Sequence, residues 1–438
     1  MSINPDIIVI GAGAGGMMAA GRAAECGARV KILEKMEQPG KKILVSGKSR
    51  CNLTNSCDLE TFIRAFGPNG RFLYSAFNRF FREELIDFLN KRGVETKTER
   101  GGRVFPASDK ARDVVAAFKS YLKENRVDLQ TQSEVKVILT EKGAVSGVRT
   151  ASAEWPCRAV ILAAGGASWP ATGSTGDGFR LAAGLGHTIT KLRPALVPLV
   201  VEEIELAQNL QGTSLKNICL TAYRGRSDSI DSPQSWKNII DSRRGEMMIT
   251  HFGLGGPVTL LMSLDIVDAL DSGPVSAAID LKPALDMEEM QLRLQRDFNT
   301  FSRRSFQNIL KELLPQKMIA PIVKLSGIPA EKKANQINAR ERDGLAVLLK
   351  SLRFNIRGPL PLSSAMVTAG GVSLKEIDPR SLASKLVKGL YFCGEVMDLD
   401  ADTGGYNLQA AFSTGFVAGE GAAQFIRSQP DGFVKGAV

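Results

Sequence analysis

A glycine-rich stretch near the start of the chain has the residue types and spacing that hold a nucleotide diphosphate. It reads GAGAGG and fits the pattern G-x-G-x-x-G at Gly11, Gly13 and Gly16. In that pattern the first glycine permits a tight turn, the second lets a pyrophosphate approach the backbone, and the third lets a helix pack closely on a strand. The diphosphate would then rest on free amides at the positive end of a helix.

The residues around these glycines complete a βαβ unit. The apolar run 7–10 predicts a buried parallel strand, the run rich in Ala and Met after the glycines predicts a helix, and 29–33 predicts a second strand. Glu34 follows directly, 18 residues after Gly16, where an acid accepts hydrogen bonds from a ribose. A carboxylate there would repel a 2′-phosphate, so FAD or NAD is favoured over NADP. With strand, helix, strand and acid in place, a nucleotide site is favoured over a structural glycine turn.

The bulk composition is that of a globular protein of two or three domains. The chain has 438 residues, of which 44% are hydrophobic and 23% charged. No apolar run reaches about 18 residues, so no membrane span is predicted. The first strand begins so close to Met1 that we expect no signal peptide and a cytoplasmic protein.

The net charge of +10, from 56 basic and 46 acidic residues, predicts a slightly basic surface. A patch for acidic substrates, nucleotide phosphates or RNA is the functional alternative. No basic run with interleaved aromatic residues supports RNA. We therefore expect a small-molecule substrate and do not expect nucleic acid as a partner, while the oligomeric state stays open.

The cysteines and histidines are too few and too scattered for a metal site or a disulfide scaffold. There are six cysteines without a C-x-x-C pair, and two histidines, His187 and His251. Cys51 and Cys57 lie near the place where flavin disulfide reductases carry a redox pair. Their spacing has five intervening residues instead of four, and no second dinucleotide fingerprint follows. Two reduced thiols are therefore favoured over a catalytic disulfide.

Residues 38–55 are too polar and glycine-rich for a helix or a buried strand, and they predict a long loop. The loop follows the ribose-binding acid and carries Lys42, Lys48 and Arg50. A loop in that place lies alongside an extended cofactor, where its amides, cations and Asn side chains could meet the pyrophosphate and a flavin ring. The alternative is an ordinary surface loop.

The following stretch alternates predicted helices and strands. Helical spacing of phenylalanines and leucines predicts two helices over 61–91, and 111–125 predicts an amphipathic helix. Further expected elements are strands at 93–98, 103–106, 127–132, 135–140, 144–150 and 159–163, and a helix over 177–183. Asp177 is the expected cap of that last helix.

From Arg193 the sequence changes to short predicted strands separated by turns, which indicates a new domain. We predict three domains in all. We expect an FAD-binding Rossmann-like domain over 1–192 and 368–438, a β-rich domain over 193–285 and 352–367, and a helical insertion over 286–351. An exposed hairpin tip is expected at 227–237.

The C-terminal region has the same pattern of strand, glycine-rich loop and helix as the N-terminal region. A strand over 389–395 ends at Gly394-Glu395, an acidic loop follows, and 407–425 predicts a helix rich in small residues. The acid would meet ribitol or phosphate. The helix start at Gly404-Gly405 would face the flavin pyrimidine edge, where negative charge develops on reduction.

With these pieces placed, the chain resembles the bacterial HI0933-like flavoproteins, a family of the two-dinucleotide-binding-domain type that includes aminoacetone oxidase and the bile-acid-pathway flavoproteins. The resemblance covers nearly the whole chain and rests on GAGAGG with Glu34, GKKILVSGKSRCNLTN, LAAGGASWPATGSTGDG, ITHFGLGGP, MVTAGGV and GLYFCGEVMDLDADTGGYNLQAAFSTG. Two departures are Lys48-Ser49-Arg50, where Gly-Arg is expected immediately before Cys-Asn, and Gly255, where a Ser is usual.

The resemblance implies an α/β fold: a Rossmann-like domain with non-covalent FAD, a β-barrel-like second domain and a helical third part. By position, the implied FAD contacts are Gly11, Gly13, Ala14, Gly15, Glu34, Lys35, Lys42, Ser46, Gly47, Arg50, Cys51, Asn52, Val135, Ala164, Gly165, Gly394, Glu395, Gly405, Tyr406, Asn407 and Leu408. It implies an oxidoreductase without fixing the substrate.

The first functional hypothesis is therefore hydride transfer between a small organic substrate and FAD, with reoxidation by oxygen or coupling to NAD(P)H. The alternatives are a flavoprotein acting on RNA and a non-catalytic FAD redox sensor. His251 is the candidate residue near the substrate, against a buried histidine that caps a helix or bonds a carbonyl. Tyr406 and Asn407 could line the ring or the substrate pocket. Lys42 and Arg50 could hold phosphate or steer an anionic substrate.

Overall fold

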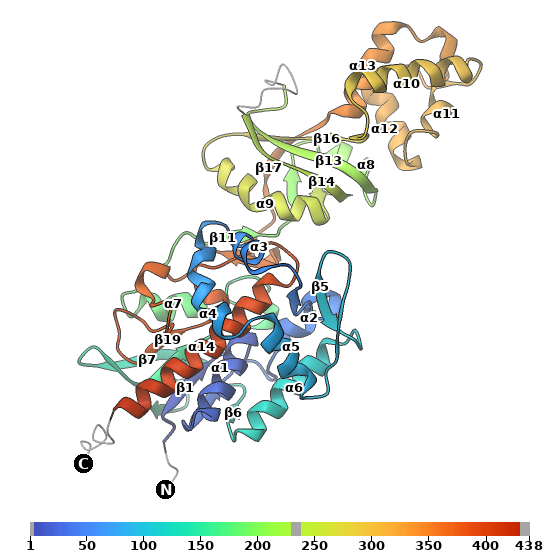
Figure 1. The fold of residues 1–438 in the computed structure, drawn as a ribbon. Coiled ribbons are helices and arrows are strands. Elements are labelled where there is room, and N and C mark those ends of the chain that lie inside the picture. Colours follow the sequence, from blue (N-terminus) through green and yellow to red (C-terminus); the bar gives the residue numbers. More distant parts are fainter. Residues whose placement is uncertain (1–3, 229–237, 430–438) are drawn as a thin grey trace. The chain divides into compact units, whose positions relative to one another are not determined.

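The chain folds into two compact units. The computed structural model describes residues 4–228 and 238–429. Unit 1 comprises residues 1–193 and 366–438, and unit 2 comprises residues 194–365 (Figure 1). The expected hairpin tip at 227–237 lies outside the described residues apart from its first two.

A parallel five-stranded sheet forms the centre of unit 1. Its strands, in spatial order, are β19 (Leu390–Phe392), β10 (Ala159–Leu162), β1 (Ile7–Ile10), β2 (Val30–Leu33) and β6 (Asp128–Gln130). Every residue of β1, β2 and β10 is buried, which explains the continuous apolar sequences of β1 and β10, while the lysine in β2, Lys31, pairs with Asp128. The C-terminal strand pairs with β10 in parallel, so the chain returns to the sheet with which it began. The predicted Rossmann-like architecture is thereby confirmed.

Two glycine-started helices cover this sheet in direct backbone contact. Helix α1 (Ala14–Glu25) packs on α14 (Tyr406–Ser428). A Cβ atom on Gly415 would lie 2.4 Å from the carbonyl oxygen of Gly15, and one on Gly419 would lie 2.4 Å from that of Ala19. The contact positions advance together along both helices, so the helices run parallel and their N-termini point to the same end.

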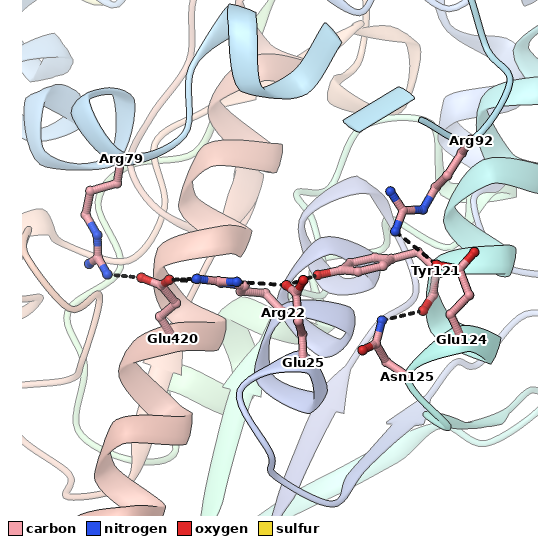
Figure 2. Close-up of polar contacts among 8 residues, drawn as sticks. All are labelled: Arg22, Glu25, Arg79, Arg92, Tyr121, Glu124, Asn125 and Glu420. Carbon is pink, nitrogen blue, oxygen red and sulfur yellow. Dashed lines mark hydrogen bonds and ion pairs between the residues drawn. The ribbon is translucent and has the colours of Figure 1, made fainter. Parts of the chain in front are cut away.

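A row of polar side chains ties four helices together beside this contact (Figure 2). The Arg22 guanidinium on α1 donates from Nε to Glu420 on α14 at 2.9 Å and from Nη1 to Glu25 at 2.8 Å. Arg79, at the end of α4 (Tyr74–Arg79), also donates to Glu420. The Tyr121 hydroxyl on α6 (Ala111–Glu124) donates to Glu25 at 3.0 Å. Although burial acts to raise the pKa of Glu25, its bonds to Arg22 and Tyr121 leave that pKa below its usual value.

The prediction of a loop over 38–55 is wrong in part. Residues Lys41–Ser49 form a short helix, α2, and Thr54–Asn55 form strand β3. The buried Ile43 anchors the first turn, and the backbone leaves helical geometry from Ser46 to Lys48. The mixed sequence hides this helix because its interruption falls after little more than one turn.

The prediction of two helices over 61–91 is also wrong. The stretch contains α3 (Leu59–Arg64), a 3₁₀ helix (Gly67–Leu73), α4 and α5 (Arg82–Asn90). The phenylalanine stripe nevertheless packs as core, because Phe62 contacts Phe77, Phe81 and Phe66 within the buried cluster. The other elements of unit 1 are β4 (Thr96–Thr98), β5 (Arg103–Pro106), β7 (Val135–Glu141), β8 (Ala144–Thr150), β9 (Glu154–Pro156) and α7 (Asp177–Ala183).

Unit 2 is built on a closed barrel. The strands, in spatial order, are β12 (Leu199–Val201), β15 (Gly253–Gly255), β14 (Ile239–Thr250), β13 (Ser214–Arg224), β16 (Val275–Asp280) and β17 (Leu352–Pro359). Helix α9 (Pro257–Leu270) packs on the barrel. Helices α10 (Met287–Thr300), α11 (Phe306–Leu310), α12 (Gln316–Ser326) and α13 (Ala339–Lys350) lie between β16 and β17 in sequence (Figure 1).

The α1–α14 contact generates a stability prediction. Gly419→Ala places a methyl group against the Ala19 carbonyl, so we expect a loss of about 1–3 kcal/mol in urea unfolding followed by circular dichroism. Gly344→Ala, within α13, is the control, because a Cβ there meets no described atom within 4 Å. It should gain about 1 kcal/mol from helix propensity. Equal effects of the two substitutions would contradict the packing described above.

Candidate functional site

The glycine turn before α1 has the geometry of a diphosphate cradle. Gly11 has φ 98°, and a Cβ on Gly16 would lie 1.9 Å from the Gly11 carbonyl oxygen. A Cβ on Gly13 would meet no described atom within 4 Å outside its chain neighbours, so the space in front of this residue is open. Gly13 is the N-cap of α1 and supplies no side-chain cap. The first amides of the helix, those of Ala14 and Gly15, are thus oriented for an anion.

Glu34 joins the glycine turn to the end of β2. Its carboxylate accepts hydrogen bonds from the Ala12 amide at 2.6 Å and the Met36 amide at 2.9 Å. The residue is buried, with 9% of its surface exposed. The Ser133 amide donates to the Glu34 carbonyl at 2.8 Å, which brings the start of β7 at Val135 close to it. Each carboxylate oxygen can accept a further hydrogen bond, so these contacts leave room for a ribose hydroxyl.

Lys35 is bound to the loop before α7. Its ammonium group lies 2.5 Å from the Asp177 carboxylate and also contacts the Thr175 hydroxyl. Partial burial acts to raise the pKa of Asp177, but its hydrogen bonds to Lys35 and Thr175 hold that pKa below the usual value. The expected role of Asp177 as helix cap is wrong, since Gly176 is the N-cap and Asp177 is the first helical residue.

A polar cluster around Glu395 connects three distant segments of unit 1. The Glu395 carboxylate accepts from Lys42 at 2.6 Å, from the Ser168 hydroxyl at 3.1 Å and from the Thr368 amide at 2.9 Å. Lys42 also donates to the Ser168 hydroxyl at 2.9 Å. The structure therefore brings together two predicted site residues, Lys42 and Glu395. Ser168 and Thr368 were missed, although both lie in motifs that carry the family resemblance.

Two glycine-bearing strand ends adjoin this cluster. Ala164 and Gly165 follow the end of β10 after Ala163, and Gly394 follows the end of β19 after Cys393. Gly165 and Gly394 have φ values of 71° and 74°. The Gly394 amide donates to the Thr414 hydroxyl on α14 at 3.0 Å, which fixes the end of β19 against that helix.

The segment from Gly47 to Cys51 is held in an unfavourable backbone conformation. Gly47, Lys48, Ser49 and Cys51 all have φ between 57° and 65°. Three of these four residues carry side chains, which costs about 1 kcal/mol or more for each. Ser49 occupies the position where the resemblance led us to expect glycine, and its φ of 65° is one that favours glycine. The strain is retained because Cys51 is fully buried beneath the segment.

Arg50 is bound by carboxylates of a neighbouring hairpin. Its guanidinium lies 2.8 Å from Glu99 and 3.2 Å from Asp109, and it stacks 4.0 Å above the Phe105 ring. These bonds hold the pKa of Asp109 low, with Lys97 as its strongest partner. The polar partners of Arg50 in the described part of the chain are Glu99 and Asp109 and not the Lys42–Glu395 pair, so its expected phosphate role stays a prediction.

The start of α14 is pressed against the strand that follows the strained segment. A Cβ on Gly405 would lie 2.3 Å from the Thr54 carbonyl oxygen, and Gly405 has φ 101°. The Asn55 side chain donates to the Gly404 carbonyl at 3.0 Å. Asn407 holds the acidic loop through its amide group, with bonds of 3.0 and 2.9 Å to the backbone of Ala401. Gly405, the N-cap, supplies no side-chain cap to the helix.

The Tyr406 side chain packs into the aromatic core of unit 1. The ring packs edge-on against Phe62 at 4.7 Å, and the hydroxyl lies 3.8 Å from the Cys57 sulfur. Burial, reinforced by Cys57, raises the pKa of Tyr406, and burial also raises the pKa of the Cys57 thiol. Leu408, the next apolar residue on α14, is partly buried against the same core.

Two buried polar atoms in this region have no partner in the part of the chain that is described. They are Oδ1 of Asn52 and Oγ1 of Thr54, which lie on the segment facing Gly405. Buried oxygens without partners are uncommon and expensive, so they mark a place where a ligand can donate. Together with open Gly13 and two uncapped helix starts, they fit an extended dinucleotide such as FAD.

The spacing of the two helix starts suits such a cofactor. Gly15 is one residue from the start of α1, and its partner Gly415 is nine residues from the start of α14. Because the helices are parallel, the start of α14 projects about 12 Å beyond that of α1 at 1.5 Å per residue. One helix start can therefore receive a diphosphate while the other meets the far end of the same molecule.

The structure bears on two questions that the sequence left open: whether His251 is buried, and whether Cys51 and Cys57 form a redox pair. His251 is exposed in the turn between β14 and β15 in unit 2, so the alternative of a buried histidine is wrong. Cys51 and Cys57 are both free thiols, and burial raises the pKa of Cys51 to about 12. A thiol with such a pKa is protonated at neutral pH and is a poor nucleophile.

The described residues show no metal cluster and no spanning helix. Within 4–228 and 238–429, no three His, Cys, Asp or Glu side chains gather as metal ligands. Over the same residues, no helix combines the length and apolar character needed to cross a bilayer.

The fold and the two uncapped helix starts define a Rossmann-type flavoprotein of the oxidoreductase class. The profile of the HI0933-like protein Rossmann domain matches residues 5–421, and the chain belongs to this family. It is 32% identical over 421 residues to a 3-dehydro-bile acid delta(4,6)-reductase of Clostridium scindens, covering 95% of this chain and 98% of that protein. It is 30% identical to a ribosomal RNA dihydrouridine synthase of Escherichia coli, covering 95% and 97% of the two chains.

Solved structures share the fold at lower sequence identity. A 3-ketosteroid delta1-dehydrogenase from Sterolibacterium denitrificans superposes with a TM-score of 0.53 at 15% identity, over 96% of this chain and 99% of that chain. The Sdh1 complex of Mycobacterium smegmatis gives 0.51 at 16% identity, over 98% and 69%. At these identities the likeness shows the fold alone.

The strained segment generates the second prediction. Ser49→Gly removes the Cβ from a left-handed position, so we expect it to raise the free energy of unfolding by about 1 kcal/mol. Ser120→Gly, on the exposed face of α6, should instead lower it by about 0.5 kcal/mol. Urea titrations of the three proteins measure both changes. A loss of stability in Ser49→Gly would show that the side chain contributes more than the strain costs.

The open space at Gly13 generates the third prediction. Gly13→Ala should fold normally, because its methyl group meets no described atom, yet it should lose bound FAD because that methyl occupies the expected diphosphate position. Gly16→Ala places its methyl 1.9 Å from a carbonyl and should fail to fold stably. Flavin absorbance per protein and circular dichroism measure the two effects. Wild-type flavin content in folded Gly13→Ala would overturn the placement.

Proposed function

We propose that this protein is an FAD-dependent reductase of a carbon–carbon double bond conjugated with a carbonyl group in a small organic substrate. The observation that carries the FAD assignment is the parallel pair of uncapped helix starts, with open Gly13 between strand and helix. The chain's membership of the family supports the same cofactor. FAD, when bound, supplies hydride transfer.

The names of two relatives support the double-bond chemistry. A delta(4,6)-reductase of a 3-dehydro compound removes double bonds in conjugation with a ketone. Formation of dihydrouridine from uridine likewise saturates a ring double bond conjugated with a carbonyl. In both cases the carbonyl accepts the charge that develops when hydride adds to the far carbon. The same reaction class therefore accounts for both names, whereas the substrates differ.

The proposed roles of the chain's own residues follow from their positions. Gly11, Gly13 and Glu34 would hold the diphosphate and ribose, and Lys42 with Glu395 would hold the ribityl and phosphate groups. The amides at the start of α14 would face the ring edge that gains negative charge. The orphan oxygens of Asn52 and Thr54 would accept from the bound group.

Completion of the reduction requires one proton at the carbon next to the carbonyl. We propose His251 for this role, because it is exposed and a histidine side chain is a common proton donor in enzymes. For the electrons we propose NADH or NADPH as the donor, with oxygen as the competing acceptor. All six cysteines are free, which supports a reducing compartment such as the cytoplasm.

The fourth prediction tests this function. The FAD-loaded protein is reduced anaerobically with one equivalent of dithionite and then mixed with a panel of conjugated enones and the matching saturated ketones. We expect enones to restore the oxidised flavin band and to be recovered as saturated products, and saturated ketones to leave the band bleached. His251→Gln should slow enone turnover about 100-fold and leave reoxidation by oxygen unchanged.

Two outcomes would oppose the proposal. If no enone reoxidises a flavin that oxygen does reoxidise, the double-bond assignment fails and a redox-sensor role gains support. If His251→Gln turns over enones at the wild-type rate, the proton comes from another group, while the flavin assignment stands. A protein purified without extractable FAD would overturn the cofactor itself.

A further inference from the structure

Most of the excess positive charge of the chain lies in one helical segment of unit 2. Between residues 303 and 340 there are eight basic side chains and two acidic ones, an excess of six out of a total net charge of +10. The basic residues are Arg303, Arg304, Lys311, Lys317, Lys324, Lys332, Lys333 and Arg340. They are dispersed in the sequence and form no basic run, so the sequence left a patch for RNA as an alternative only.

The fold brings several of these cations together. The chain before α11 runs antiparallel to the chain before α13, with a bridge between Ser305 and Lys333. The Phe306 amide donates to the Lys332 carbonyl at 2.8 Å, and the Ala334 amide donates to the Arg304 carbonyl at 3.1 Å. Two basic pairs that are nearly thirty residues apart in sequence, 303–304 and 332–333, therefore lie side by side.

Two further contacts extend this surface. The Lys332 ammonium pairs with Glu341 at 2.6 Å, which holds the first turn of α13, and with it Arg340, against the paired segments. Lys311, one turn beyond Asn308, donates to the Asn308 side chain at 2.7 Å. We call the surface formed by Arg303, Arg304, Lys311, Lys333 and Arg340 the basic strap.

Three of the five cations of the strap have no acidic partner among the described residues. Arg303, Lys333 and Arg340 are exposed, and none forms an ion pair with any described residue. Of the two acids of the segment, Glu312 pairs with Arg304 at 3.2 Å, whereas Glu331 is bound by the neutral Gln307 amide at 2.5 Å and keeps its negative charge. A cluster of uncompensated cations raises the local concentration of polyanions and accelerates their association.

The side chains between the cations are amides and not apolar groups. Exposed amides on and beside the strap are Asn308, Asn335, Gln336 and Asn338. Phe306 is fully buried, and the exposed large apolar side chains nearest in sequence are Val347 on α13 and Leu325 on α12, seven and eight residues from the strap. A membrane-binding surface needs apolar side chains that insert below the headgroups, which the strap lacks. Amides among cations suit RNA, since cations meet phosphates while amides reach 2′-hydroxyls and base edges.

We infer that the basic strap is a docking surface for RNA. This inference goes beyond the proposed reductase function and does not need the flavin, because the strap belongs wholly to the helical segment of unit 2. It also revises the expectation that nucleic acid is not a partner.

The fifth prediction uses the full-length, FAD-loaded protein and a labelled single-stranded RNA of mixed sequence. The test variant is Arg303→Glu/Lys333→Glu/Arg340→Glu. The control variant, Lys119→Glu/Lys123→Glu/Lys142→Glu, makes the same change in net charge at exposed positions of unit 1. We expect RNA binding by wild type and control, and at least about tenfold weaker binding by the test variant, with a salt slope reduced by about 2 for three lost phosphate contacts.

Further variants and a vesicle control distinguish RNA binding through the strap from a general charge effect and from membrane binding. Arg303→Gln/Lys333→Gln/Arg340→Gln, which introduces no repulsion, should also weaken binding, and flavin absorbance with circular dichroism verifies that each variant is folded. No RNA binding by wild type at low salt would overturn the inference. So would equal weakening in test and control variants, since the charge would then act from the whole surface. Strap-dependent binding to phosphatidylglycerol vesicles without RNA binding would assign the surface to membranes and would equally overturn it.

Discussion

The nucleotide-binding half of this protein depends on the direct contact between the backbones of α1 and α14. Gly415 lies over the carbonyl of Gly15, and Gly419 lies over the carbonyl of Ala19, with no room for a side chain between them. Residues 400 positions apart in sequence are thereby locked in parallel, and the Arg22–Glu420 pair reinforces the register. Because both helices are then oriented alike, the positive ends of both dipoles face the same side of the sheet. A single extended anion can therefore contact the N-termini of both helices at once, whereas one helix alone would offer a single N-terminus.

The segment from Gly47 to Cys51 shows the energetic cost of this arrangement. Four residues with left-handed backbone lie next to a strand whose carbonyl, at Thr54, touches Gly405. Such strain persists only where the surroundings determine the conformation, here through the buried Cys51 and the hairpin that binds Arg50. The result is a segment already shaped before any ligand arrives, with two orphan oxygens in it. A preorganised site binds with a smaller entropic penalty than a loop that must first be ordered.

The sequence predicted those parts of the molecule whose cause is local. Continuous apolar runs predicted the central strands, glycine spacing predicted the turn at Gly11, and a run rich in small residues predicted α14. It missed α2, because a helix interrupted at Ser46 carries too few turns for a periodic signal. It also missed Ser168 and Thr368, since a hydroxyl near an acid is recognisable only when the fold has placed Glu395 beside it. Likewise, nothing local indicates that Arg50 meets Glu99.

The helical segment between β16 and β17 can vary in its outer side chains without a change in the fold that supports it. It leaves the barrel after β16 and re-enters at β17, and these strands are paired at Ile279 and Leu352. The ends of the insertion are therefore held together by the barrel itself. Its interior residues, such as Phe306 and Leu345, share one apolar core with the barrel strands. Neither constraint involves the outer side chains, so the charge at Arg303 and Lys333 is not required for folding. Cations such as Arg303 and Lys333, which repel one another and form no ion pair with a described residue, are better explained by what they bind.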